Sequence, residues 1–308
     1  MVNVAIGPAR LMPSGTVTYP DEMSPQLTVA GLYRYPVKSC RGIALTEAEV
    51  SRMGIRYDRQ WMVVDERGMF VAQRGDSGRG VGVRSLALVE TALDSGALVL
   101  AAPGMPPLSL PLAGLPGTRE KVRIWESGVE AVDQGPEAGA WFTEYLSRER
   151  PGAYRLVRMP DDGVRPASRG QGQLAFADGY AFMILSTASL DDLNHRMPRP
   201  LPVDRFRPSV VISAAEPYLE DRMAHIRIGT LELTGTTRCV RCPIPTFDQR
   251  TLERGKEPLR TLASYRRTSR GVVFGRNFNH AGTGLLAIGD PVEVLAWHDH
   301  DVEPGLTG

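Results

Sequence analysis

Two cysteines in the segment TTRCVRCPIPTFDQ are the residues of this sequence whose types and spacing point most directly to chemistry. Cys239 and Cys242 are spaced as Cys-x-x-Cys, and Arg238 and Arg241 stand beside them. A cysteine thiolate is both a nucleophile and a soft metal ligand, and neighbouring cations lower the pKa of the thiol. The segment therefore predicts a site for a ligand that is anionic and also binds sulfur.

Several interpretations of this cysteine pair are open. A zinc site needs four ligands, but the chain has no second Cys-x-x-Cys, and the nearest histidines, His225 and His280, are distant in sequence. A thioredoxin-like dithiol would stand at the start of a helix, which Pro243 and Pro245 oppose. The other possibilities are two packed thiols, or a single thiolate that binds a metal or a cofactor.

Basic residues at expected turns are the second signal. Lys38 and Ser39 follow the apolar run YRYPV, and a lysine, a hydroxyl and exposed backbone N–H groups at a strand end suit a phosphate. Arg59 and Arg207 each stand just before an apolar run, where a guanidinium group can bind an anion with two hydrogen bonds. Each of these residues could equally be an ordinary solvated charge at the end of a strand.

The elements that must position these residues are mainly β-strands. Short runs rich in β-branched and aromatic residues recur between Gly, Pro and Asp, among them LTVAGLYRYPV, RQWMVVD, GALVLAA and KVRIWES. HIRIGTLEL alternates around Gly229-Thr230, which predicts a hairpin. Apolar residues in helical register predict helices within residues 137–150, 186–197 and 257–267. We therefore expect an α+β, mostly β, protein with a few short helices.

The same pattern suggests how the chain is divided. We expect a flexible extension over residues 1–26, an antiparallel β-rich domain over 27–150, a second domain over 151–297, and a tail over 298–308. The Gly-rich segment 165–173 is typical of a mobile loop.

Composition restricts the class of protein. The chain has 36 basic and 35 acidic residues, a net charge of +1, so we expect neither nucleic-acid nor membrane partners. Three cysteines are too few for a secreted disulfide scaffold, and no apolar run has the length of a membrane span. The expected location is cytoplasmic.

Taken in order, many segments of the chain resemble one known family. YPVKSCRGIALTEAEVSRMGIRYDRQWMVVDERGMFVAQR is similar to the N-terminal β-barrel-like domain that precedes a MOSC (molybdenum cofactor sulfurase C-terminal) domain, and the second half resembles the MOSC domain itself. The matching segments there are FADGYAFMILSTASLDDLN, RFRPSVVIS, IRIGTLEL, CVRCPIPTFDQ, KEPLRTLASYRR, FGRNF and IGDPVEVL. This resemblance implies a β-barrel fold for the second domain. It extends to the mitochondrial amidoxime-reducing component and its bacterial counterparts, which reduce N-hydroxylated compounds with a molybdopterin cofactor.

The resemblance implies a role for each matching residue. Cys242 matches the family's cysteine ligand to molybdenum, which makes it the expected metal ligand and catalytic residue; a soft thiolate suits that metal. The other matching positions are expected to bind the molybdopterin: Lys38, Ser39, Arg59, Ser186, Thr187, Ser189, Arg207, Arg241 and Asn277. Because these residues come from both halves of the chain, we expect the cofactor to lie between the two domains.

The implied activity is reduction of N-hydroxylated small molecules by oxygen-atom transfer to molybdenum. Electrons would come from a separate reductase, ferredoxin or cytochrome-type protein, since three cysteines cannot hold an ordinary iron–sulfur cluster. An alternative is a carrier of molybdopterin or sulfur without turnover, and a third possibility is a metal-free redox-sensing dithiol. The chain departs from the family's Cys-hydrophobic-x-Thr-Thr-Val-Asp pattern at Pro243 and Pro245, and at Asn277, where relatives often carry Tyr or Leu. These departures bear on the substrate pocket more than on the metal ligand.

Overall fold

The structure is a computed structural model that describes residues 10–11, 17–18, 27–74 and 80–298. Most of the expected extension 1–26, and all of the expected tail except His298, lie outside the described residues. Within 1–26 the backbone forms one two-stranded ladder, made by β1 (Arg10–Leu11) and β2 (Val17–Thr18).

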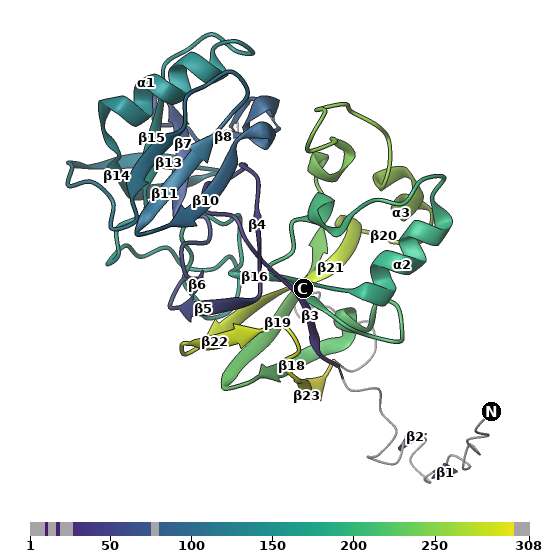
Figure 1. Cartoon of the computed structure of the whole chain (residues 1–308). Coiled ribbons are helices and arrows are strands. Elements are labelled where there is room, and N and C mark those ends of the chain that lie inside the picture. The colour runs from purple at the N-terminus through teal and green to yellow at the C-terminus, as the bar shows by residue number, and fades with distance from the viewer. Residues whose placement is uncertain (1–9, 12–16, 19–26, 75–79, 299–308) are drawn as a thin grey trace.

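A nine-stranded sheet is the centre of one unit of the molecule (Figure 1). Its strands pair in the order β23-β18-β19-β21-β16-β17-β3-β4, with β20 on the side of β21. In chain order they are β3 (Val29–Arg34), β4 (Ile43–Leu45), β16 (Phe182–Ser186), β17 (Val210–Ile212), β18 (Met223–Ile228), β19 (Leu231–Val240), β20 (Arg267–Thr268), β21 (Gly271–Ala281) and β23 (Val292–Trp297). A three-stranded sheet also belongs to this unit, formed by β5 (Glu47–Ser51), β6 (Gly54–Ile55) and β22 (Gly284–Ala287).

Smaller sheets form the second unit, at the upper left of Figure 1. A four-stranded sheet has the order β13-β14-β15-β7, a three-stranded sheet has the order β10-β11-β12, and β8 pairs with β9. The strands are β7 (Trp61–Asp65), β8 (Val71–Ala72), β9 (Val81–Gly82), β10 (Glu90–Asp94), β11 (Ala97–Ala101), β12 (Leu108–Pro111), β13 (Arg119–Ile124), β14 (Ser127–Asp133) and β15 (Tyr154–Arg158). Among the described strand pairs only β8–β9 and β16–β17 are parallel, which confirms the predicted antiparallel character.

Strand pairing does not divide the chain at residue 150, where we expected the domain boundary. β3 and β4 pair within the nine-stranded sheet, although they precede the second unit in sequence. Conversely, β15 lies beyond residue 150 but pairs with β14 and β7. The chain thus begins in one unit, builds the other from β7 to β15, and then returns (Figure 1). Residues of the two segments where the chain passes from one unit to the other can therefore lie close together.

Three α-helices occur in the described part of the chain, and all three were predicted. They are α1 (Gly135–Leu146), α2 (Thr187–Arg196) and α3 (Leu259–Tyr265). α1 buries Trp141, Phe142 and Tyr145, as their helical spacing predicts. α2 begins after Ser186, whose side chain accepts a hydrogen bond from the backbone N–H of Ser189. Short 3₁₀ turns are η1 (Arg84–Leu88), η2 (Val203–Phe206), η3 (Leu219–Arg222) and η4 (Ile244–Thr246).

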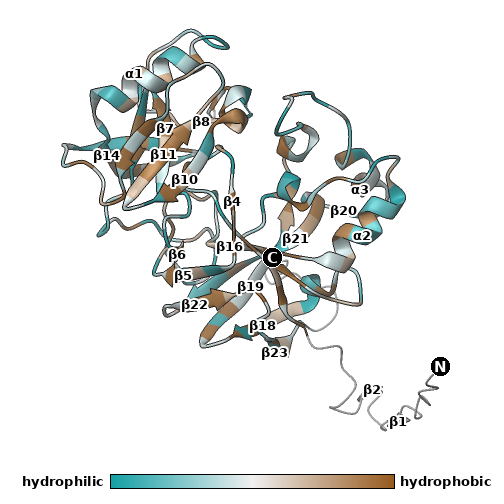
Figure 2. Ribbon diagram, viewed as in Figure 1, coloured by the Kyte–Doolittle hydropathy of each residue, from teal (hydrophilic) through white to brown (hydrophobic). Residues whose placement is uncertain are grey.

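Each unit has its own hydrophobic core. Val29 and Leu32 of β3 pack with Ile184 of β16 and Phe278 of β21 in the larger unit. In Figure 2 the apolar residues follow the strands, including β7 and β11, whereas much of α2 is hydrophilic. Within the described residues, no helix has both the length and the apolar character needed to cross a bilayer.

The predicted loop 165–173 is an irregular segment closed by hydrogen bonds. The backbone N–H of Ala167 donates to the carbonyl of Gly172 at 3.0 Å. The buried Arg165 guanidinium group donates to the carbonyls of Ala175, Ala177 and Asp178. This segment therefore has a defined place beside the start of β16.

Candidate functional site

A cavity of about 450 Å³ lies where the chain passes between the two units. Its wall contains eight basic side chains and one carboxylate, that of Asp178. The basic residues are Lys38, Arg59, Arg169, Arg205, Arg207, Arg238, Arg241 and Arg270. A concave site lined by charges of one sign concentrates the electric field of the protein, so this cavity is suited to an anionic ligand.

Lys38 and Ser39 enter the cavity wall from the turn after β3. The backbone N–H of Lys38 donates to the carbonyl of Trp61 at 2.8 Å, which fixes this turn against β7. The buried ammonium group of Lys38 donates to the carbonyl of Phe176 at 3.0 Å and pairs with Asp178. Desolvation lowers the pKa of Lys38, and Asp178 opposes that effect.

Asp178 keeps most of its side chain exposed while holding that ion pair. The indole N–H of Trp125 also donates to its carboxylate at 3.1 Å. Desolvation would raise the pKa of Asp178, but Lys38 and Trp125 outweigh it and lower the pKa to about 2. Asp178 is therefore an anion at every ordinary pH.

Arg59 and Arg207 approach the cavity from two different turns, and both contact one aromatic ring. Arg59 pairs with the buried carboxylate of Asp58 at 2.5 Å, and Arg207 donates to the carbonyl of Cys40 at 2.9 Å. Both guanidinium groups lie over the ring of Tyr35. Desolvation lowers the pKa of Arg207, and Arg59 adds to that effect, yet an arginine with this pKa shift stays charged.

Three residues of the cavity wall have a left-handed backbone. The φ angles are 70° for Ser39, 48° for Arg59 and 55° for Arg207. A non-glycine residue in this region costs on the order of 1–3 kcal/mol, and such strain occurs preferentially at functional sites. The cluster supports a binding role for this part of the wall.

Arg241 and Asn277 complete the wall on the side of β19 and β21. Arg241 donates to the carbonyl of Phe274 at 2.9 Å and to that of Phe206 at 3.0 Å. The side-chain amide of Asn277 donates to the hydroxyl of Thr237 at 3.2 Å. These bonds hold both side chains in place beside the cavity.

Cys239 and Cys242 both line the cavity at the end of β19, and neither forms a disulfide. Cys239 also packs against an apolar cluster that includes Met183, Leu185 and Phe274. Burial raises the pKa of the Cys242 thiol, while the backbone N–H of Ile244 and the charges of Arg74 and Arg241 oppose this. Among the described residues there is no group of three or more His, Cys, Asp or Glu side chains able to hold a metal, as a zinc site would require.

The segment after Cys242 forms the adjoining part of the wall. Pro243 precedes η4, and Ile244 and Pro245 line the cavity. Arg205 holds this segment, because its guanidinium group donates to the carbonyl of Pro245 at 3.2 Å and to Asp248 at 2.6 Å. Ile244 and Pro245 therefore form a fixed, apolar portion of the cavity wall, directly after Pro243.

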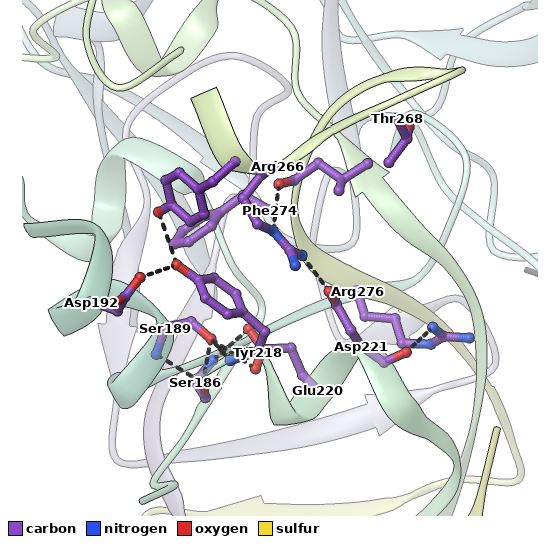
Figure 3. Close-up of polar contacts among 12 residues, drawn as sticks. Ser186, Ser189, Asp192, Tyr218, Glu220, Asp221, Arg266, Thr268, Phe274 and Arg276 are labelled. Atoms are coloured by element: carbon purple, nitrogen blue, oxygen red, sulfur yellow. Dashed lines mark hydrogen bonds and ion pairs between the residues drawn. The ribbon is translucent and has the colours of Figure 1, made fainter. Parts of the chain in front are cut away.

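Ser186, Thr187 and Ser189, which the resemblance assigned to the cofactor, do not line this cavity. Figure 3 shows Ser186 and Ser189 beside Tyr218 and Glu220. The hydroxyls of Ser186 and Ser189 are 2.7 Å apart, and Ser189 donates to the fully buried carboxylate of Glu220 at 3.0 Å. The hydroxyl of Thr187 accepts a hydrogen bond from the backbone N–H of Ala214 at 3.4 Å. The Ser186 hydroxyl caps α2, the Ser189 hydroxyl bonds the buried Glu220, and the Thr187 hydroxyl bonds the backbone of Ala214; none of the three lines the cavity.

Four charged residues of the wall were not predicted from the sequence: Arg169, Asp178, Arg205 and Arg270. Arg205 stands two residues before Arg207, and this spacing could have identified it. Arg169 lies within the Gly-rich segment 165–173, Asp178 follows that segment, and Arg270 stands in the turn between β20 and β21. Only the packing of these turns around one cavity distinguishes them from surface charges.

The residues present fit a large anion that also carries a metal with affinity for sulfur. Basic groups and the Ser39 hydroxyl are available for phosphate, and two thiols stand on the same wall. The thiols that this wall offers to a metal are those of Cys239 and Cys242. Cys239 is the one that packs against apolar neighbours.

Comparison with known proteins agrees with this geometry. Residues 26–149 match the family described as the MOSC N-terminal beta barrel domain, and residues 171–293 match the MOSC domain. The chain is 35% identical to mitochondrial amidoxime-reducing component 1 of Homo sapiens, over 87% of this chain and 83% of that protein. It is 34% identical to component 1 of Mus musculus, over 87% and 82%, and 34% identical to component 2 of Rattus norvegicus, over 86% and 82%.

Proposed function

This chain belongs to the MOSC-domain family, and from that premise we propose that it is a molybdenum-cofactor-dependent oxidoreductase that reduces N-hydroxylated compounds. The names of the relatives support the reaction, since they are amidoxime-reducing components. The observation that carries the proposal is the cavity itself, in which eight basic side chains and two thiols line one wall.

The cofactor would be held by residues of that wall. Cys242 would be the protein ligand to molybdenum and the catalytic residue. Lys38, Ser39, Arg59 and Arg207 would bind the anionic part, with Arg241 and Asn277 beside it. When bound, the cofactor supplies the two-electron chemistry that cleaves the N–O bond. We leave Ser186, Thr187 and Ser189 out of this set because their hydroxyls bond elsewhere.

The chain's own residues would position and bind rather than react. Left-handed backbones at Ser39, Arg59 and Arg207 aim three groups at one space before any ligand arrives, which reduces the ordering cost of binding. Ile244 and Pro245 give the substrate an apolar surface next to the thiols. A fixed apolar wall of this kind favours planar, aromatic N-hydroxylated substrates over strongly charged ones.

We also propose a separate electron donor of the reductase, ferredoxin or cytochrome type, because three cysteines are one short of the four thiolates of an ordinary iron–sulfur cluster. The cytoplasmic location that the low cysteine content suggests stays part of this proposal. Cell fractionation with an antibody against the chain tests it.

Metal analysis tests the central claim. We expect about one molybdenum per chain in protein purified from a host that makes the cofactor. Cys242→Ala should lose the metal, and Cys239→Ala, the matched control three residues away, should keep it. Absence of molybdenum from the wild type, or its retention in Cys242→Ala, contradicts the proposed ligand.

Turnover separates an enzyme from a carrier. With an artificial electron donor, the molybdenum-loaded protein should reduce benzamidoxime to benzamidine, and Cys242→Ala should not. A protein that holds stoichiometric molybdenum but reduces no N-hydroxylated compound with any donor would instead be a carrier of the cofactor.

A further inference from the structure

Gln73 and Gln249 form a buried pair that connects the two units of the molecule. The Nε2 atom of Gln73 donates to Oε1 of Gln249 at 2.9 Å, and Nε2 of Gln249 donates back to Oε1 of Gln73 at 3.2 Å. Gln73 is 1% exposed and Gln249 is 9% exposed. Neither residue lines the cavity.

The orientation of both amides follows from a third group. Nε2 of Gln73 also donates to the carbonyl oxygen of Ser39 at 2.6 Å. A carbonyl can only accept, so the atom of Gln73 that faces it must be the nitrogen, and the partner atom on Gln249 must then be an oxygen. Each donor of the pair is thus matched with an acceptor.

The pair joins two parts of the cavity wall that are distant in sequence. Gln73 is hydrogen-bonded to the Lys38–Ser39 turn through Ser39, and Gln249 ends the buried part of the segment that follows Cys242. Arg41 reinforces the connection by donating to the carbonyl of Gln249 at 3.2 Å. On its other side the same segment is held by Arg205, from the larger unit.

We propose that the Gln73–Gln249 pair is a positioning device that fixes the segment carrying Cys242 against the Lys38–Ser39 turn. The proposal rests on the proposed function, since it assigns these two ends of the wall to one cofactor. A ligand held at both ends binds well only if their separation is set beforehand, and truncating one member of a buried amide pair leaves the facing amide oxygen of the other without its donor.

Trypsin cleavage of the cofactor-free, full-length protein tests whether the pair holds the segment. Arg250 and Arg254 are exposed sites that directly follow Gln249. Cleavage of a native chain reports the population of locally opened molecules. We expect Gln249→Ala and Gln73→Ala to be cut at these sites about tenfold faster than the wild type, as loss of one buried hydrogen-bonded pair predicts. Thr251→Ala, an exposed change in the same segment, should be cut at the wild-type rate.

Two single-atom changes give a signature that general destabilisation would not. In Gln249→Glu, Gln73 can still donate both to Ser39 and to the new carboxylate, and the contacts that become acceptor–acceptor are the longer ones, at 3.2 Å to Oε1 of Gln73 and 3.4 Å to the carbonyl of Phe247. In Gln73→Glu, the two short contacts become acceptor–acceptor, at 2.6 Å to the Ser39 carbonyl and 2.9 Å to Oε1 of Gln249, and the repulsion is stronger. We therefore expect Gln73→Glu to be cut several-fold faster than Gln249→Glu, although each change buries one negative charge. Equal rates for the two, or wild-type rates for both alanine variants, overturn the inference.

The rate at which the loaded protein loses molybdenum then tests whether the Gln73–Gln249 pair positions the cofactor-binding residues, as distinct from stabilising the fold. Loaded Gln249→Ala should lose its metal about tenfold faster than the wild type during dialysis, with unchanged activity per remaining molybdenum. Faster cleavage with unchanged retention would make the pair merely structural and overturn the inference. If the wild type binds no molybdenum, the proposed function fails, whereas the cleavage comparison still decides whether the pair holds the segment.

Discussion

The guanidinium carbon of Arg207 lies 4.2 Å from the centroid of the Tyr35 ring. The corresponding atom of Arg59 lies 4.3 Å from the same centroid. Tyr35 is almost fully buried, and its hydroxyl donates to the carbonyl of Pro208 at 3.1 Å. A β-carbon at position 42 would come within 2.3 Å of this ring, so Gly42 is required for the approach. One aromatic ring thus holds two like charges beside the cavity.

Replacing Tyr35 by leucine should weaken anion binding. The ring attracts each desolvated guanidinium group by about 1–2 kcal/mol, and without it the two cations repel each other and separate. We expect the cofactor-free Tyr35→Leu variant to bind inorganic pyrophosphate about tenfold more weakly than the wild type, as measured by titration calorimetry. Tyr35→Phe keeps the ring and should remain within about threefold of the wild type. Equal affinities for the leucine and wild-type proteins would show that the ring does not organise this clamp.

Asp178 should contribute stability that disappears in acid. Its pKa is lowered to about 2 from an ordinary value of 3.8, so the folded protein binds this proton more weakly than the unfolded chain. The contribution is complete above the ordinary value and is lost as the pH falls from about 4 toward 2. Urea unfolding at several pH values should show that the difference between wild type and Asp178→Asn shrinks over that range. Glu66→Gln, at an exposed turn, serves as the control, and a constant difference for Asp178→Asn contradicts the prediction.

Ser189 should contribute to the stability of the fold and not to ligand binding in the cavity. Its hydroxyl accepts the backbone N–H of Tyr218 at 2.7 Å and donates to the buried Glu220, whose pKa desolvation raises (Figure 3). Ser189→Ala leaves the Tyr218 N–H without this acceptor and leaves Glu220 with the backbone N–H of Ser186 as donor, so the free energy of unfolding in urea should fall by about 2 kcal/mol. Ser264→Ala, at an exposed helix position, should change it by less than about 0.5 kcal/mol. The affinity for pyrophosphate should be unchanged in Ser189→Ala. A large loss of affinity would show that Ser189 belongs to the binding site.

Features that depend on neighbours along the chain could be predicted from the amino-acid sequence alone. Trp141, Phe142 and Tyr145 recur at helical spacing, and one face of α1 buries all three. Gly229 adopts a positive φ of 58° in the predicted hairpin between β18 and β19. The mostly β, α+β class followed from the same local patterns, because side-chain period and turn chemistry act within a few residues.

Which residues share the cavity depends on strand pairing between distant parts of the chain. β3 pairs with β17, which lies about 180 residues later, and this pairing brings the Lys38–Ser39 turn to the turn that holds Arg207. Arg169, Asp178 and Arg270 line the cavity for the same reason, since nothing near them in sequence distinguishes them from surface charges. Ser189 was assigned to the cofactor by resemblance, but burial against Glu220 gave its hydroxyl another partner. Sheet order and burial are set by contacts between distant segments, and these are the contacts that short-range patterns do not contain.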